Sequence, residues 1–68
     1  MDRVPVSSSM IASIGYEPQS LVLEVEFNNG SVYQYTDVPE GEYESFLNAD
    51  SKGAYFHTNI KKYPCTRL

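Results

Sequence analysis

A predicted β-hairpin over residues 21–36 constrains the fold of this 68-residue chain more than any other stretch. The stretch reads LVLEVEF, then NNG, then SVYQYT. In its first half, every second residue is a large apolar one, which places four such side chains on one face of an extended strand. These four are Leu21, Leu23, Val25 and Phe27. Asparagine and glycine tolerate positive φ angles, so Asn28-Asn29-Gly30 predicts the tight turn that joins two antiparallel strands.

The length of this turn decides which way the second strand faces, and two lengths are possible. A two-residue turn pairs Phe27 with Val32 and sets the tyrosines of the second strand on the outer face, beside the glutamates. A three-residue turn pairs Phe27 with Ser31 instead. The tyrosines, Tyr33 and Tyr35, then face the apolar side. A slip of one residue turns every side chain to the other face, and we favour the three-residue turn because it keeps the large apolar groups together.

One further strand is predicted before the hairpin, over residues 10–16. Its two faces carry Met10, Ala12, Ile14 and Tyr16 on one side and Ile11, Ser13 and Gly15 on the other. Pro18 suits the second position of a type I turn that leads into the hairpin. The earlier stretch Val4-Pro5-Val6 is expected to be an extended entry arm. Three strands joined by short turns predict an antiparallel meander, one face of which must be covered.

Two short helices are predicted to provide that cover. Pro39 fits the first position of a helix, and Ser51 fits the cap of a second helix that ends before Pro64. The apolar stripes of the two helices are Tyr43, Phe46 and Leu47, and then Phe56, Ile60 and Tyr63. Residues 65–68 are expected to be a loose tail. The predicted fold class is therefore α+β, a three-stranded antiparallel β-meander covered on one face by two short C-terminal helices.

Length and composition predict one domain, residues 1–68, with a thin core supplied largely by six tyrosines and three phenylalanines. A single cysteine cannot form an internal disulfide, which favours an intracellular, cytoplasmic protein. No apolar run is long enough for a signal peptide or a membrane span, so no membrane partner is predicted.

The charges are distributed unevenly along the chain. Residues 1–50 contain all nine acidic residues and only Arg3 as a base, whereas residues 51–68 contain the other four basic residues and no acid. An acidic body disfavours broad, non-specific binding of nucleic acid, because neutralisation of phosphates dominates such binding. The basic C-terminal segment can still bind a phosphate or dock on the acidic half of its own fold.

No catalytic or metal-binding constellation is predicted, and no cofactor. His57 and Cys65 are each the only residue of their type, and we expect one in a helix and the other in the tail. A Cys–His nucleophile pair needs both groups in contact together with an orienting group. The glutamates of the first predicted helix are spaced by two, which predicts a solvated acidic face instead of a metal site.

Two features admit both a binding role and a purely structural one. Ser51-Lys52-Gly53 places a hydroxyl, a cation and a bare backbone at a helix start, which suits an anion but equally suits simple capping. Tyr33 and Tyr35 lie on neighbouring same-face positions, where aromatic side chains can stack nucleobases or pack in the core. We favour capping for the first feature and packing for the second.

Several motifs follow one another in order along the chain: Ser9-Met10-Ile11, Gly15-Tyr16, the strand from Leu23 to Phe27, Asn29-Gly30, Tyr33-Gln34-Tyr35, Val38-Pro39, Ser51, Gly53, Tyr55-Phe56, Ile60 and Tyr63. Their order and spacing resemble the KTSC domain, a family named after the C-terminal extension of some lysyl-tRNA synthetases and also found as free-standing bacterial proteins. The resemblance implies a domain of unestablished function for which RNA binding has been proposed, without catalytic residues. Tyr33 and Tyr35 match the Tyr-x-Tyr motif of the family. Ser51, Gly53, Phe56 and Tyr63 match its later Ser-x-Gly and aromatic positions.

From these observations we predict a small, non-enzymatic binding module whose partner is RNA, either tRNA-like or single-stranded. The predicted RNA- or anion-binding residues are Tyr33, Tyr35, Ser51, Lys52, Gly53, Lys61, Lys62 and Tyr63. The alternative is a protein-interaction or regulatory domain that uses the acidic sheet face around Glu24 and Glu26 and binds no nucleic acid. Hydrolysis or transfer at Ser51, His57 or Cys65 is the least supported class.

Overall fold

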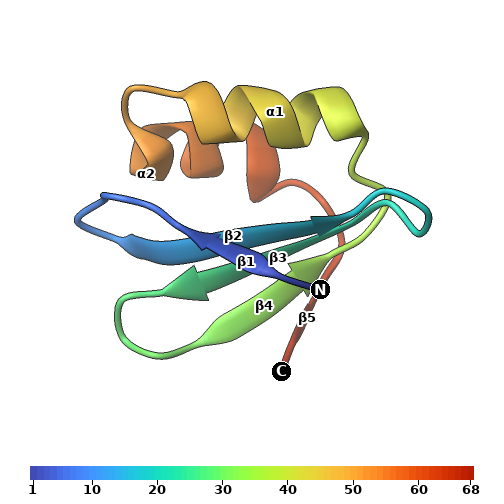
Figure 1. Ribbon diagram of the computed structural model, residues 1–68, viewed down its shortest axis with the longest axis horizontal. Helices are drawn as coiled ribbons and strands as arrows, with labels where there is room; N and C mark the ends of the chain where they lie inside the picture. Colours follow the sequence, from blue (N-terminus) through green and yellow to red (C-terminus); the bar gives the residue numbers. More distant parts are fainter.

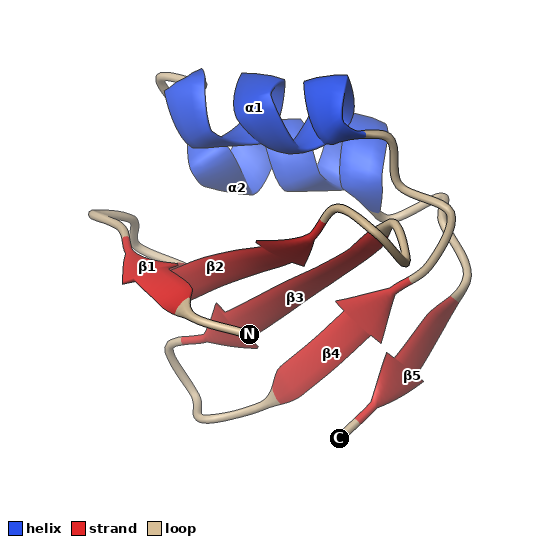
Figure 2. Cartoon of the chain, turned by 45° about the vertical axis from the view of Figure 1, so that its right-hand side comes forward, coloured by secondary structure: helices blue, strands red, loops and turns tan.

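A five-stranded antiparallel sheet, with helices packed on one of its faces, forms the molecule (Figures 1 and 2). The computed structural model describes residues 1–68. The elements in chain order are β1 (Arg3–Pro5), β2 (Ile11–Glu17), β3 (Val22–Phe27), β4 (Val32–Tyr35), α1 (Glu40–Asn48), α2 (Lys52–Tyr55), a π-helical turn η1 (Phe56–Ile60) and β5 (Cys65–Arg67). The strands lie in the sheet in the same order as in the chain. The predicted α+β class with an antiparallel sheet and two helical segments on one face is therefore confirmed.

The prediction of three strands is wrong, because both chain ends add an edge strand. The expected entry arm forms β1, which pairs with β2 and places Val4 opposite Ile14. The expected loose tail forms β5, which pairs with β4 and places Thr66 opposite Gln34. Each edge strand has only three residues, too few for the alternation of apolar and polar residues that reveals a strand in sequence. Such short edges also limit unwanted pairing with other chains.

The hairpin has the predicted three-residue turn. The Phe27 amide donates a hydrogen bond of 2.8 Å to the Ser31 carbonyl, and Gly30 has a φ of 93°. Beyond the turn, Val25 lies opposite Tyr33 and Leu23 lies opposite the second tyrosine of the strand. Both tyrosines therefore point to the face that the helices cover. Leu21 differs from expectation, since it ends the preceding turn with a φ of 58° and is exposed.

A β-bulge in β2 changes the predicted faces of that strand. The pairing with β3 shifts between Ile11 and Ser13, so that Ala12 is the extra residue. Ile11 and Ile14 consequently lie on the same face, and both are fully buried. Strict alternation had placed them on opposite faces, because a sequence pattern of period two cannot show where a bulge interrupts it.

The core lies between the sheet and the helices. It consists of Ile11, Ile14, Leu23, Val25, Tyr35, Val38, Phe46, Phe56 and Ile60. Phe46 of α1 is fully buried, and Tyr43 and Leu47 pack beside it, which confirms the predicted stripe of the first helix. Tyr16 ties the segment before α1 to the sheet, because its ring stacks on Tyr43 at 4.8 Å and its hydroxyl donates to the Val38 carbonyl at 2.5 Å.

The second helical segment begins as predicted but continues in an unpredicted way. The Ser51 hydroxyl accepts a hydrogen bond from the Ala54 amide at 3.2 Å, which confirms the capping interpretation. After one α-helical turn the chain widens into η1, where the Lys61 amide donates to the Phe56 carbonyl, five residues earlier, at 2.9 Å. Single π-helical turns are rare in proteins, and those that do occur often lie at functional sites.

Candidate functional site

An open groove of about 530 Å³ lies between η1 and the β4–β5 side of the sheet. Its aromatic lining comes from three elements: Phe27 from β3, Tyr33 and Tyr35 from β4, and Phe56 from η1. The hairpin turn closes one end through Asn29 and Ser31. The predicted Tyr-x-Tyr pair therefore lines a cavity, and the three-residue turn places both rings there.

The four aromatic rings support one another. Phe56 meets Phe27 edge to face with 5.3 Å between ring centroids, and it meets Tyr35 in the same way at 5.7 Å. Tyr33 lies edge to face with Phe27 at 5.9 Å and is stacked beside Tyr35 at 6.4 Å. Such pairs contribute roughly 0.5–1.5 kcal/mol each beyond their buried area. Because Phe56 and Tyr35 are buried whereas Tyr33 and Phe27 are half-buried, the rings form a fixed platform with accessible aromatic surface.

Two cationic side chains, Lys61 and Arg67, lie beside this platform. Lys61 and His57 line the groove from the helical side. On the opposite side, the Arg67 guanidinium of β5 lies over the Tyr33 ring at 6.0 Å from its centroid, which is within the range of a cation–π contact. None of the nine residues that line the groove is acidic. The groove is thus a local exception to the net charge of −4 of the whole chain.

The π-helical turn explains how Lys61 reaches the groove. Phe56 and Lys61 both line it, although they are five residues apart. In an α-helix, residues five apart point about 140° away from each other. The i→i+5 bond of η1 closes one turn over five residues instead, so the two side chains share one face. A sequence analysis based on helical spacing could not place Lys61 beside Phe56.

Tyr35 keeps its proton throughout the neutral range. Burial raises the pKa of its phenol to about 12, and the neighbouring Cys65 and Tyr33 add to the effect. The hydroxyl is therefore available as a donor, and the Tyr35 ring adds no charge to the floor of the groove.

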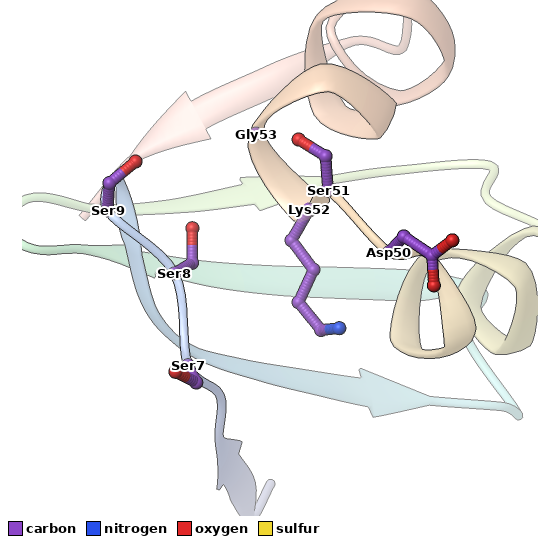
Figure 3. Close-up of a pocket in the computed structure, with 7 residues that line it drawn as sticks. All are labelled: Ser7, Ser8, Ser9, Asp50, Ser51, Lys52 and Gly53. Carbon is purple, nitrogen blue, oxygen red and sulfur yellow. The ribbon is translucent and has the colours of Figure 1, made fainter.

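The other predicted anion-binding residues lie in a separate cavity of about 280 Å³, lined only by polar residues (Figure 3). Figure 3 shows the loop Ser7-Ser8-Ser9 facing the segment from Asp50 to Gly53. Three of these side chains, those of Ser8, Ser51 and Lys52, already have partners within the chain. The Ser8 hydroxyl accepts from the Met10 and Ile11 amides, and the Lys52 ammonium donates to the Ala49 carbonyl at 2.9 Å.

Lys62 and Tyr63, also predicted as binding residues, do not line either cavity. The Tyr63 hydroxyl donates to the Glu42 carboxylate of α1 at 2.9 Å. The Lys62 ammonium lies 5.5 Å from the centroid of the Tyr63 ring. The structure therefore brings Tyr33, Tyr35 and Lys61 together and leaves the remaining predicted site residues elsewhere.

Several groove residues were not among the predicted binding residues. Phe27 and Phe56 read only as core residues, and their apolar spacing gave no sign of a cavity. Arg67 and Cys65 were assigned to a loose tail, so nothing indicated that β5 would bring them to Tyr33 and Tyr35. His57 was expected on an exposed helical surface, and it is exposed, but at the rim of the groove.

Two general features complete the description of the surface. No three His, Cys, Asp or Glu side chains converge as a metal ion would require. No helix combines the length and the apolar character needed to cross a bilayer.

Comparison with known proteins identifies relatives of two kinds. The chain is 43% identical over 61 residues to an uncharacterised protein of Stutzerimonas stutzeri, covering 90% of this chain and 86% of that protein. It is also 47% identical over 53 residues to a lysine–tRNA ligase of Nostoc sp., covering 78% of this chain but only 9% of the ligase. The chain thus corresponds to a small part of the ligase.

A solved structure and a family model agree with these relatives. The crystal structure of a KTSC domain protein from Yersinia pestis superposes with a TM-score of 0.94 at 46% identity, covering 98% of this chain and 96% of the other. The family model of the KTSC domain matches residues 7–63. This chain therefore belongs to the KTSC domain family.

Proposed function

We propose that this protein is a non-enzymatic module that binds unpaired nucleotides of RNA in the groove beside η1, in the cytoplasm. The observation that carries the proposal is the meeting of an aromatic platform with cationic side chains, in a groove that no acidic residue lines. Proteins that bind single-stranded nucleic acid combine these two elements, because bases stack on aromatic rings while cations neutralise the backbone phosphates.

The aromatic part of the groove suits bases more than phosphates. Tyr33 and Phe27 are half-buried, so each retains ring surface that a base can cover. Stacking of one base on an aromatic side chain contributes about 1–3 kcal/mol and tolerates any base sequence. Arg67 already covers part of Tyr33 and can stack on a base or contact its phosphate. Lys61, which lines the groove, supplies a second cation.

The relatives support RNA as the nucleic acid. A segment of a lysine–tRNA ligase matches this chain, and such an enzyme acts on a tRNA. Sequence-specific RNA recognition mostly targets loops and ends, where bases are unstacked. We therefore place the unpaired regions of a tRNA-like RNA in the groove. The polar cavity at Ser51 is a second candidate site for a phosphate, although the Ser51 and Lys52 side chains are already bonded within the chain.

Two neighbouring lysines give a matched test of the proposal. Lys61 lines the groove and Lys62 does not, yet Lys61→Glu and Lys62→Glu change the net charge equally. We expect Lys61→Glu to weaken binding of a labelled single-stranded RNA of about ten nucleotides at least tenfold more than Lys62→Glu does, measured by fluorescence anisotropy at low salt. Equal effects of the two changes would show that the groove is not the binding surface.

An NMR titration with the same RNA locates the contact independently. Amide shifts should gather at the residues of the groove, from Tyr33 to Tyr35 and from Phe56 to Lys61, and should weaken as salt rises. The turn from Pro18 to Ser20 lines neither cavity and serves as the internal reference. A well-dispersed spectrum that RNA leaves unchanged would refute RNA binding.

A protein partner is the second candidate, and the open face of the sheet favours it. No helix covers that face (Figure 2). It carries Glu24, bonded to Arg3 at 3.0 Å and to Gln34 at 2.9 Å, and Glu26, which accepts from the Ser13 hydroxyl at 2.8 Å. These bonds hold both carboxylates in fixed positions on the face that no helix covers. Repeated co-purification of one protein without RNA, abolished by Glu24→Lys but not by Lys61→Glu, would favour this candidate.

Catalysis is excluded from the proposal, although the structure brings two reactive groups to the same groove. His57 and Cys65, which the sequence had separated, both line it. Replacing Ser51, His57 and Cys65 together by alanine should change only stability and RNA affinity, and it should abolish no hydrolysis or transfer activity. Loss of a measurable hydrolysis or transfer activity in that variant would contradict the non-enzymatic assignment.

A further inference from the structure

One carboxylate joins α1 to both ends of the π-helical turn. Glu42, in the first turn of α1, accepts a short hydrogen bond from the Tyr55 hydroxyl on one oxygen. Its other oxygen accepts from the Tyr63 hydroxyl at 2.9 Å. Tyr55 is the last residue before η1, and Tyr63 lies three residues after its end. The two phenols therefore bracket the segment Phe56–Ile60.

All three side chains are half-buried, and each is supported by further contacts. The Tyr55 ring stacks on the buried Phe46 of α1 at 5.7 Å. The hydrogen bond that the Tyr55 hydroxyl donates to Glu42 raises the pKa of Tyr55, while burial, assisted by the same carboxylate, raises the pKa of Tyr63. Both phenols thus stay protonated as donors, and hydrogen bonds to a charged acceptor are roughly twice as strong as neutral ones.

The geometry points to Glu42 as the residue that holds η1 in its π-helical form, and we propose that it thereby positions Lys61 in the groove. A π-helical turn is less favourable than an α-helical one and needs support from its surroundings. The bonds to Tyr55 and Tyr63 fix the distance between the two ends of the turn. If the turn relaxes to an α-helix, the Lys61 amide moves to a new acceptor and its side chain rotates away from Phe56.

The Glu42 carboxylate forms no hydrogen bond to a residue that lines the groove. It acts through the two tyrosines and is therefore a positioning residue. This role differs from that of Glu44 on the same helix. Glu44 is exposed, and its carboxylate makes no hydrogen bond or ion pair, since the Asn48 side chain donates to its backbone carbonyl instead. Replacing either glutamate by alanine removes the same charge from the same helix, which makes Glu44→Ala the matched control.

The first measurement concerns the turn itself and does not involve RNA. In NMR spectra of the full chain, Glu42→Ala should shift the Lys61 amide and the Phe56 carbonyl, the two ends of the i→i+5 bond, whereas Glu44→Ala should leave both in place. The double change Tyr55→Phe and Tyr63→Phe removes the same two bonds without changing the charge and should reproduce the shifts. Unchanged Lys61 and Phe56 signals in these variants would overturn the proposal.

The second measurement concerns the groove and rests on the proposed function. Removing an acidic residue should by itself leave RNA affinity equal or higher, as expected for Glu44→Ala. Glu42→Ala should instead weaken binding about tenfold, because Lys61 leaves the groove. In a double-mutant cycle, Glu42→Ala should have little further effect once Lys61 is replaced by glutamine. Additive losses would overturn the positioning role, since they would show that Glu42 does not act through Lys61.

The two measurements separate failure of this inference from failure of the proposed function. A wild-type chain that binds no RNA refutes the proposed function, while the Lys61 and Phe56 signals still decide whether Glu42 holds the turn. If the Lys61 and Phe56 signals move in Glu42→Ala but RNA affinity does not fall, the groove remains the candidate site. That result would overturn the proposal that Glu42 positions Lys61 for binding.

Discussion

Replacing Tyr35 by phenylalanine should make the protein more resistant to alkaline unfolding. Burial raises the pKa of the Tyr35 phenol in the folded state to about 12, above its ordinary value of 10.0. As the pH rises above 10, the unfolded chain releases the proton before the folded chain does. Ionisation therefore favours unfolding, and the stability that Tyr35 contributes below pH 10 is lost between pH 10 and 12. Phenylalanine at this position has no proton to release.

The size of the effect follows from the two pKa values. At pH 11, the linkage of this one group lowers the free energy of unfolding by about 1.3 kcal/mol relative to pH 9. For a domain of this length, that corresponds to a fall in Tm of roughly 5–10 °C. Tyr35 is 4% exposed, so solvent screens the difference little. The pKa values of Tyr16, Tyr55 and Tyr63 are also raised, but these residues are present in both proteins and their effects cancel in the comparison.

Urea unfolding, followed by circular dichroism at pH 9, 10 and 11, measures the difference directly. The stability of the wild type minus that of Tyr35→Phe should fall steadily over this range. A difference that stays constant with pH would refute the reasoning, because it would mean that the phenol titrates alike in the folded and unfolded chains.

Three further substitutions test the backbone and the packing. Gly30→Ala and Gly41→Ala make the same chemical change, and neither added methyl group meets a neighbouring atom. Because Gly30 has a φ of 93°, Gly30→Ala should lower the free energy of unfolding by about 1–2 kcal/mol in thermal unfolding. Because Gly41 lies in α1, Gly41→Ala should raise it by about 0.5–1 kcal/mol. Changes of the same sign would contradict the assigned turn. Tyr16→Phe removes the donor to the carbonyl of the fully buried Val38 and should cost about 1–3 kcal/mol in urea unfolding; an unchanged midpoint would show that the bond contributes nothing.

The parts of the fold that the sequence predicted share one physical property: neighbouring residues determine them. The register of the hairpin followed from Asn28-Asn29-Gly30 and from the grouping of apolar side chains, which decided between two explicit alternatives. The first helix followed from the stripe that ends at Leu47 and from Pro39, which lies at the N-cap, one residue before the predicted first helical position. The start of the second helix followed from the Ser51 cap. Each of these signals lies within a few residues of the structure that it specifies.

The parts that sequence analysis missed depend on distant contacts. Strand β5 exists because it pairs with β4. At the ends of this pairing, the Thr36 amide donates to the Pro64 carbonyl and the Leu68 amide donates to the Val32 carbonyl, and no local pattern reveals these partners. The bulge at Ala12 depends on how β2 fits β3. The π-helical turn departs from the local preference for an α-helix, and Glu42, more than ten residues earlier in the chain, bonds to both of its flanks.

The missed elements are not scattered over the molecule. Strand β5 brings Cys65 to the groove and Arg67 to the Tyr33 ring, while η1 contributes Phe56 and is followed directly by Lys61. Sequences usually agree with their structures at every level, and local rules are broken chiefly where function requires it. A π-helical turn lowers the stability of a domain whose small core leaves it only marginally stable. In return, the turn places the cationic Lys61 beside the aromatic platform. This position of Lys61 is the strongest reason, beyond the shape of the groove, to test the groove for RNA binding before the polar cavity at Ser51.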